Sequence, residues 1–135
     1  MSDRLAVGDS LTRSVGIDRQ RTIGFMGEEA RVYATPWLVH DIEHACRDLI
    51  LSRIPEGEDS VGISVSVTHT APTPLGMEVE ITVTVAAVEG RRVRLEVSAR
   101  DPVEPICKGS HERFIVDVEQ TKRRLLAKIA RAGQG

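Results

Sequence analysis

Apolar residues recur every three or four positions between residues 34 and 52, and this spacing predicts one amphipathic helix. Thr35 is expected to cap its amino terminus, and Pro36 suits the first helical position, where its missing N–H is no loss. The predicted apolar face consists of Leu38, Val39, Ile42, Ala45, Cys46, Leu49 and Ile50. Glu43 lies at the edge of that face, where a carboxylate is unfavourable unless it is paired or retained for chemistry.

From Ser60 the pattern changes to a period of two, which is typical of a strand with one buried face. The same parity makes His69 the last inward residue of this strand, after Val61, Ile63, Val65 and Val67. Residues 77–85 and 93–99 also alternate and predict two more strands. The last predicted strand, residues 106–118, keeps no single parity, and Gly109 is interpreted as a bulge.

The remaining segments are shorter or less regular. Residues 10–15 predict a short strand, residues 18–32 a strand or an irregular loop, and residues 119–130 a short amphipathic helix or tail. The antiparallel strands need a cover for their apolar face, and the helix at residues 34–52 is the long apolar element available. We therefore predict an α+β hot-dog fold, a curved antiparallel sheet wrapped around one central helix. Its open sheet edges favour a homodimer, which can pair further into a tetramer.

Composition fits a single domain over residues 1–135, with a C-terminal helix or tail at 119–135. The chain is 41% hydrophobic and 28% charged, as in folded globular proteins. A net charge of −2 and 3% aromatic residues argue against nucleic-acid binding. Cys46 and Cys107 show no metal-ligand spacing and are expected to be buried free thiols, so no metal is predicted. Residues 1–8 lack the apolar run of a signal peptide and no stretch is long enough to cross a bilayer, which predicts a cytoplasmic protein with no membrane partner.

Three residues are candidates for chemistry. The inward face that ends at His69 packs on the helix that carries Glu43, so these two side chains are expected to form an acid–base pair. Thr35 offers a hydroxyl at the helix amino terminus, where free N–H groups and the helix dipole stabilise an oxyanion. Eight helical residues, about 12 Å, separate Thr35 from Glu43. We therefore expect one subunit to supply Thr35 to a site that Glu43 of the other subunit completes.

Each candidate also has a purely structural interpretation. Thr35 before Pro36 is explained by helix capping alone, and a histidine at a strand end is often a structural side chain. Glu43 has two cationic neighbours on its own helix, His40 and Arg47, with which it can pair. His44 and His111 have the pattern of ordinary, partly exposed residues.

The chain resembles the fluoroacetyl-CoA thioesterase family of hot-dog proteins, in the right order and spacing from Tyr33 onward. The residues that carry the resemblance are Tyr33-Ala34-Thr35, Ile42-Glu43-His44-Ala45-Cys46, Ser66-Val67-Thr68-His69-Thr70-Ala71-Pro72-Thr73-Pro74, Val88-Glu89-Gly90-Arg91-Arg92 and Gly109-Ser110-His111-Glu112-Arg113. The resemblance implies a homodimeric acyl-CoA thioesterase with no metal and no cofactor beyond the coenzyme A of its substrate. It also implies that Thr35, Glu43 and His69 are catalytic, that Arg113 belongs to the active site, and that the Gly62 backbone lies near the acyl group.

The chain departs from the family at the segment before the helix. The fluoroacetyl-specific member has phenylalanines there that form a lid over the acyl pocket, whereas Met26 and Glu29 occupy the corresponding positions here. Pro36-Trp37 also replaces the smaller residue that follows the catalytic threonine. We therefore predict hydrolysis of a short or medium acyl-CoA other than fluoroacetyl-CoA.

Two other functions remain open at this stage. One is a hot-dog protein that binds acyl-CoA without turning it over. The other is a hydratase of the same fold, although no Asp–His pair about five residues apart stands out near His69. The coenzyme A phosphates need basic groups, and Arg91, Arg92, Arg94 and the run at residues 122–124 are available. For any one of them, a solvated basic face is the favoured explanation.

Overall fold

The computed structural model describes residues 5–134. The described residues leave out residues 1–4, which begin the stretch without a signal-peptide pattern. They also leave out Gly135, the last residue of the predicted domain. The two helices are α1 (Thr35–Leu51) and α2 (Val118–Gln134). The strands are β1 (Ser10–Gly16), β2 (Thr22–Ile23), β3 (Val32–Tyr33), β4 (Glu58–His69), β5 (Glu78–Glu89), β6 (Arg92–Arg100) and β7 (Pro105–Asp117).

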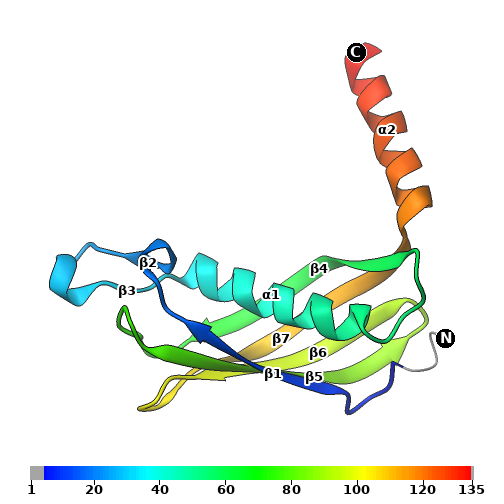
Figure 1. Cartoon of the computed structure of the whole chain (residues 1–135). Helices are drawn as coiled ribbons and strands as arrows, with labels where there is room; N and C mark the ends of the chain where they lie inside the picture. The colour runs from blue at the N-terminus through cyan, green and yellow to red at the C-terminus, as the bar shows by residue number, and fades with distance from the viewer. Residues whose placement is uncertain (1–4, 135) are drawn as a thin grey trace.

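Five strands form one antiparallel sheet in the order β1-β5-β6-β7-β4, which curves around α1 (Figure 1). The alternating residues predicted on β5 and β6 are buried against the helix, with Val79, Ile81, Val83 and Leu95 all below 2% exposed. On α1 the predicted stripe is buried from Leu38 to Ile50, except that Val39 is half-buried. The predicted curved sheet around one central helix is therefore confirmed.

The amino terminus of α1 differs from the expectation. Ala34 is the N-cap residue, and no side chain caps the helix, so Thr35 is the first helical residue rather than the cap. Ala34 is held in place because its N–H donates to Arg21 O at 2.8 Å. As a result the Thr35 hydroxyl is free to bond elsewhere.

A bulge in β4 breaks the single parity predicted for this strand. Gly62 pairs with Arg113 and Ser64 with Glu112, so Ile63 is the extra residue. Residues before the bulge therefore face the opposite way from the prediction, and Val61 lies on the outer face opposite Phe114. After the bulge the parity is restored, and His69 is on the same face as Cys107, which is buried.

The predicted bulge at Gly109 is wrong. Gly109 pairs regularly with both Val67 and Val97, and β7 keeps one parity from Cys107 to Ile115. The alternation was obscured in the sequence because two of its buried residues, His111 and Arg113, are polar. Gly109 instead allows the β7 backbone to lie close to β4, since a Cβ there would lie 2.1 Å from Ser66 O.

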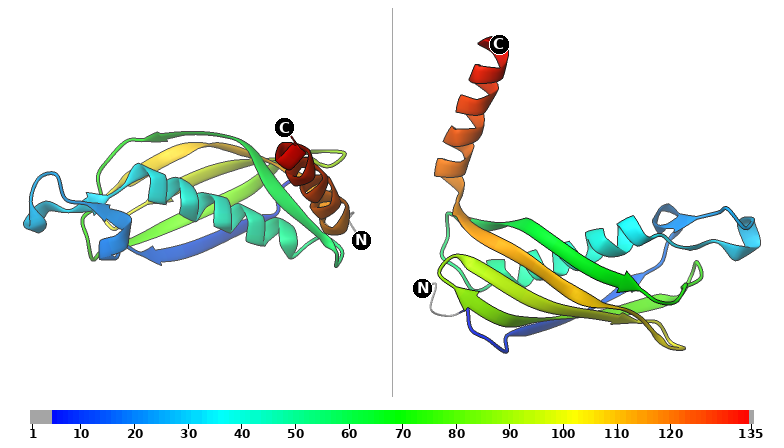
Figure 2. Two further views of the ribbon diagram at one scale, coloured as in Figure 1. Left: turned by 90° about the horizontal axis from the view of Figure 1, so that it is seen from above. Right: turned by 180° about the vertical axis from the view of Figure 1, so that it is seen from behind.

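Two segments extend from the body. Residues 18–33 form an excursion before α1, with two short 3-10 helices around the β2–β3 pair. At the other end of the sheet α2 projects away from the body and past the β4 edge, as Figures 1 and 2 show. It is longer than the predicted helix at 119–130. No helix in residues 5–134 is long and apolar enough to span a membrane.

Replacement of Gly109 by alanine should destabilise the fold, because the added methyl would collide with the β4 backbone at Ser66 and Val67. We expect a loss of about 2–3 kcal/mol in the free energy of unfolding, measured with urea. Gly133→Ala is the matched control, because a Cβ there meets nothing within 4 Å. Equal stability of Gly109→Ala and the wild type would contradict the close approach.

Candidate active site

The first part of the candidate site is a pair between the start of α1 and the end of β4. Thr35 Oγ1 lies 2.8 Å from His69 Nδ1. Both side chains line a cavity of about 260 Å³ whose other walls include Ile23, Val32 and Ala71. Burial lowers the pKa of His69 below its usual value, and the Ala71 backbone partly opposes this shift. The imidazole is therefore neutral near pH 7 and able to accept a proton.

One atom of this pair lacks a partner. His69 Nε2 is buried and makes no hydrogen bond to any of residues 5–134. When Thr35 donates its hydroxyl proton to Nδ1, the neutral ring carries its own proton on Nε2. That N–H then has no acceptor among residues 5–134.

The second part of the site surrounds Glu43. Its side chain lines a cavity of about 260 Å³ with Gly62, Val65 and His111. A Cβ on Gly62 would lie 3.2 Å from His111 Cε1 and 3.6 Å from both Arg113 Nη1 and Glu43 Oε1. The absence of a side chain at Gly62 therefore leaves room between these groups.

His111 and Arg113 fix one another beneath this cavity. His111 is 1% exposed, so the expectation of a partly exposed residue is wrong. Its Nδ1–H donates to Ser64 O at 2.8 Å, and Nε2 accepts from Arg113 Nη1 at 3.1 Å. Burial lowers the pKa of His111, and the Arg113 charge lowers it further. Arg113, 4% exposed, also donates to Ser60 Oγ and Ser60 O, both at 2.7 Å.

The two parts do not meet within one chain, so the expected His69–Glu43 pair is not formed there. The reason is that α1 and β4 run in opposite directions with different rises per residue. Eight helical residues at about 1.5 Å and four strand residues at about 3.3 Å cover nearly the same length. With Thr35 beside His69, Glu43 therefore lies level with Val65.

Glu43 is also not paired on its own helix, contrary to the structural alternative. Arg47 pairs with Asp59 and His40 with Asp41. Within residues 5–134, Glu43 forms no ion pair and accepts no hydrogen bond.

A buried carboxylate that sequence reasoning missed supports the Thr35 end of the site. Asp41 is 5% exposed and accepts hydrogen bonds from Tyr33 Oη and from Arg21 Nε and Nη2. Burial alone would raise the pKa of Asp41, but the bonds from Arg21 and Tyr33 keep it below its usual value. The Tyr33 ring packs edge-on against the His69 ring, with centroids 6.3 Å apart. Asp41 thereby anchors the excursion and the imidazole to α1.

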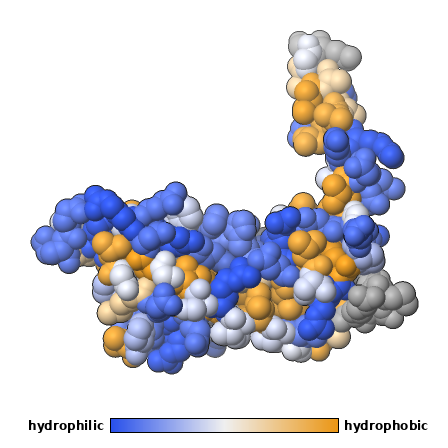
Figure 3. Space-filling view, viewed as in Figure 1, coloured by the Kyte–Doolittle hydropathy of each residue, from blue (hydrophilic) through white to orange (hydrophobic). Residues whose placement is uncertain are grey.

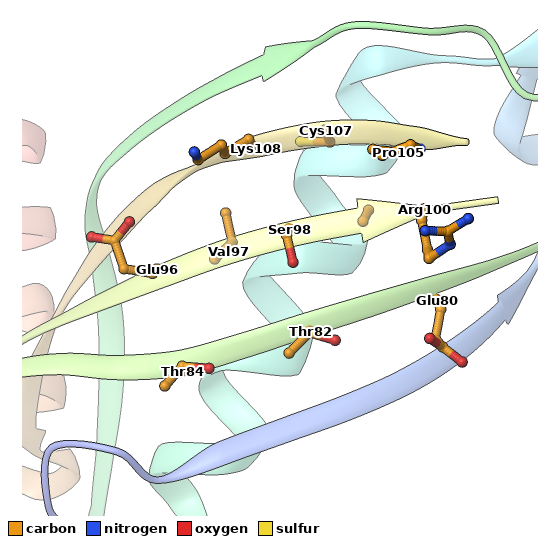
Figure 4. A pocket seen from close by; sticks show the side chains of 11 residues that line it. Glu80, Thr82, Thr84, Glu96, Val97, Ser98, Arg100, Pro105, Cys107 and Lys108 are labelled. Atoms are coloured by element: carbon orange, nitrogen blue, oxygen red, sulfur yellow. The ribbon is translucent and has the colours of Figure 1, made fainter.

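The other polar and hollow parts of the molecule do not join this site. Cys46 and Cys107 are buried free thiols, as predicted, and burial raises their pKa values to about 12 and about 11. No group of three His, Cys, Asp or Glu side chains in the described part of the chain is arranged to hold a metal ion. A cavity of about 450 Å³ lies across β5, β6 and β7 on the face away from α1 and is lined by Glu80, Thr82 and Ser98 among others (Figure 4).

Solved structures of known proteins agree with the fold. A crystal structure of the fluoroacetyl-CoA thioesterase matches at a TM-score of 0.83 with 33% identity, over 92% of this chain and 97% of that chain. A hot-dog-like protein from Thermanaerovibrio acidaminovorans matches at a TM-score of 0.85 with 28% identity, over 94% of this chain and 95% of that one. A thioesterase superfamily member from Thermus thermophilus matches at 0.80 with 30% identity, covering 93% and 96%. The fold and the site thus define a thioesterase of the hot-dog class.

The family can be stated more narrowly. The model of the fluoroacetyl-CoA-specific thioesterase family matches residues 17–119. The fluoroacetyl-CoA thioesterase of Streptantibioticus cattleyicolor is 33% identical over 127 residues, which are 89% of this chain and 91% of that protein. The chain belongs to the fluoroacetyl-CoA-specific thioesterase family, as its motifs predicted, and it is a thioester hydrolase that acts on acyl-CoA.

Replacement of Asp41 by asparagine should destabilise the protein by about 2–3 kcal/mol, because Arg21 and Tyr33 lose their charged acceptor. Urea unfolding measures this loss. Asp48→Asn is the matched control on the same helix. Asp48 pairs with Arg13 at a half-buried, solvent-accessible position, so this substitution should cost less than about 1 kcal/mol. Equal losses in the two variants would refute the anchoring role of Asp41.

Proposed function

We propose that the chain hydrolyses a short or medium acyl-CoA other than fluoroacetyl-CoA, with Thr35, Glu43 and His69 as catalytic residues. Gly62 and Arg113 are proposed to line the acyl side of the site, and the coenzyme A of the substrate is the one cofactor-like group required. The observation that carries this proposal is the 2.8 Å contact between Thr35 Oγ1 and His69 Nδ1 at the start of α1.

The chemistry follows from that contact. A neutral His69 accepts a proton from the nucleophile as the nucleophile attacks the thioester carbonyl carbon. The same proton then passes to the departing thiolate, so that free coenzyme A leaves as a thiol. The nucleophile is the Thr35 hydroxyl or a water molecule in its place. Direct attack by the Glu43 carboxylate is the third route; it releases no proton, so coenzyme A leaves as a thiolate and is protonated when His69 deprotonates the water of the second step. In the first and third routes, water hydrolyses the acyl-enzyme in a second step.

The carbonyl oxygen needs a hydrogen-bond donor as it becomes negative. Pro36 has no N–H, and the N–H groups of Trp37 and Leu38 both donate to Ala34 O. This leaves the Thr35 N–H as the donor of the first helical turn, at the positive end of the helix dipole. We assign the oxyanion contact to this amide.

A homodimer would complete the site. β4 is an edge strand, and Val61, Ile63 and Val65 on it are 41–44% exposed in the single chain. Antiparallel pairing of two β4 edges would bury part of this apolar surface. Because Glu43 lies level with Val65, a two-fold axis near Val67 brings the partner's Glu43 level with His69. The carboxylate then accepts the hydrogen bond that His69 Nε2 lacks.

The acyl specificity is argued from the excursion. Phe25 is 75% exposed and Met26 is 50% exposed, and neither lines the Thr35–His69 cavity. The apolar wall of that cavity comes from Ile23 and Val32 instead. A cavity without an aromatic lid supports an acyl group larger than fluoroacetyl. The free thiols of Cys46 and Cys107 support a reducing compartment such as the cytoplasm.

Thiol release from a panel of acyl-CoAs tests the reaction. We expect turnover of short or medium acyl-CoAs, with kcat lowered about 10²–10⁴-fold by His69→Ala and by Glu43→Ala. His44→Ala is the matched control, because His44 is exposed on the same helix and should leave kcat unchanged. Binding of acyl-CoA without thiol release would instead establish a binding protein, and full activity of both variants would refute the site.

Mixed dimers test whether two chains share each site. Co-expressed His69→Ala and Glu43→Ala chains should recover about a quarter of the wild-type activity, because half of the dimers are mixed and each holds one intact site of two. The measurement is the specific activity of the unselected mixture, and selection of the mixed dimers with two different affinity tags should raise it to about half. If all three catalytic groups belong to one chain, the mixture will be no more active than the separate variants.

A further inference from the structure

The charge of the chain is unevenly distributed between α2 and the rest. α2 holds five Lys or Arg residues and one Glu, a net charge of +4. Since the whole chain carries −2, the other residues together carry −6. Because α2 is positively charged and the rest of the chain is negatively charged, α2 of one copy is attracted to the body of a second copy.

α2 also exposes apolar side chains. Leu125, Leu126 and Ile129 are 56%, 54% and 58% exposed, and Figure 3 shows apolar surface along the projecting helix. The other end of the molecule has a matching set, because Ile23, Phe25 and Met26 of the excursion are 48%, 75% and 50% exposed. Each patch groups three exposed apolar side chains, so burial of one patch against the other would be favourable.

The topology brings these two patches together in the proposed dimer. α2 follows β7 where Asp117 pairs with Glu58, the first residue of β4, and His69 is the last residue of the same strand. Antiparallel pairing of two β4 edges reverses these ends, so α2 of one copy emerges on the His69 side of the other. The views in Figure 2 agree that α2 projects past the β4 edge, the edge at which the proposed dimer would pair.

The length of the arm fits this placement. Seventeen helical residues span about 26 Å, or roughly five strand spacings, which is enough to cross the paired edge. The excursion extends beyond the start of α1, at the end of the molecule opposite α2 (Figure 1). Ile23 belongs both to the exposed patch and to the wall of the Thr35–His69 cavity.

We propose that α2 is an exchanged arm: it packs on the 18–33 excursion of a second copy and closes the outer wall of that copy's Thr35–His69 cavity. This inference rests on the proposed dimer. Pairing of the two arms with each other is disfavoured because both are cationic. The family model ends at residue 119, just after α2 begins.

Disulfide cross-linking between two full-length variants tests the contact. One chain carries Phe25→Cys and the other Ile129→Cys, and the two are co-expressed with different tags. Cys46 and Cys107 are buried and do not compete. We expect the mixed pair to oxidise to a covalent dimer at least tenfold faster than a control pair of Ile129→Cys with Val7→Cys. Val7 is 65% exposed but precedes β1, at the opposite end of that strand from the excursion.

Sedimentation of the same samples separates the possible failures. A dimer whose Phe25→Cys and Ile129→Cys chains cross-link no faster than the control pair overturns the arm but leaves the shared active site standing. Faster cross-linking of Ile129→Cys chains with each other assigns the arms to one another and also overturns it. Binding of the protein to anionic phospholipid vesicles without cross-linking also overturns the arm. A protein that sediments as a monomer overturns both the arm and the dimer.

Discussion

The packing of α1 against β4 in opposite directions determines which side chains can act together. A helix advances about 1.5 Å per residue and a strand about 3.3 Å, so about two residues of α1 lie along each residue of β4, and one contact sets the level of all the others. This contact joins Thr35 and His69. Glu43, two turns later, then lies beside Gly62 and His111. The proposed catalytic set is thus divided by the geometry of secondary structure, and the second subunit of the proposed dimer would reunite it.

Buried polar groups hold the two halves of the site in place. Arg113 is oriented by Ser60 and by a His111 ring whose tautomer is fixed by the Ser64 carbonyl. At the other end Asp41 connects α1 to Arg21 and Tyr33. Such groups are stable in a core only when their hydrogen bonds are made, so each also fixes the positions of its partners. The apolar core supplies most of the stability, and these networks supply the alignment of the site.

The sequence predicted the parts of the fold that obey a regular period and missed those where one residue changes it. The stripe of α1 and the alternation of β5 and β6 were evident because their buried residues are apolar. The extra residue at Ile63 could not be seen, because valines and serines alternate on both sides of it. His111 was misjudged because a buried polar residue looks like a surface residue until its partner is known, although its position two residues before Arg113 places both on one face. Thr35 and His69 were found from element ends, but their direct contact required the register of α1 on β4.

Because α1 starts without a side-chain cap, stability and turnover favour different residues at position 34. Serine or aspartate at residue 34 would cap the helix and add about 1 kcal/mol of stability. Ala34 has no side-chain oxygen, so the Thr35 N–H has no acceptor among the described residues, and Thr35 lines the cavity. A capping residue at position 34 is therefore an obvious substitution for stabilising the protein. A polar oxygen at residue 34 would offset the positive end of the α1 dipole, to which we assign the substrate carbonyl. The more stable variant should therefore turn over more slowly.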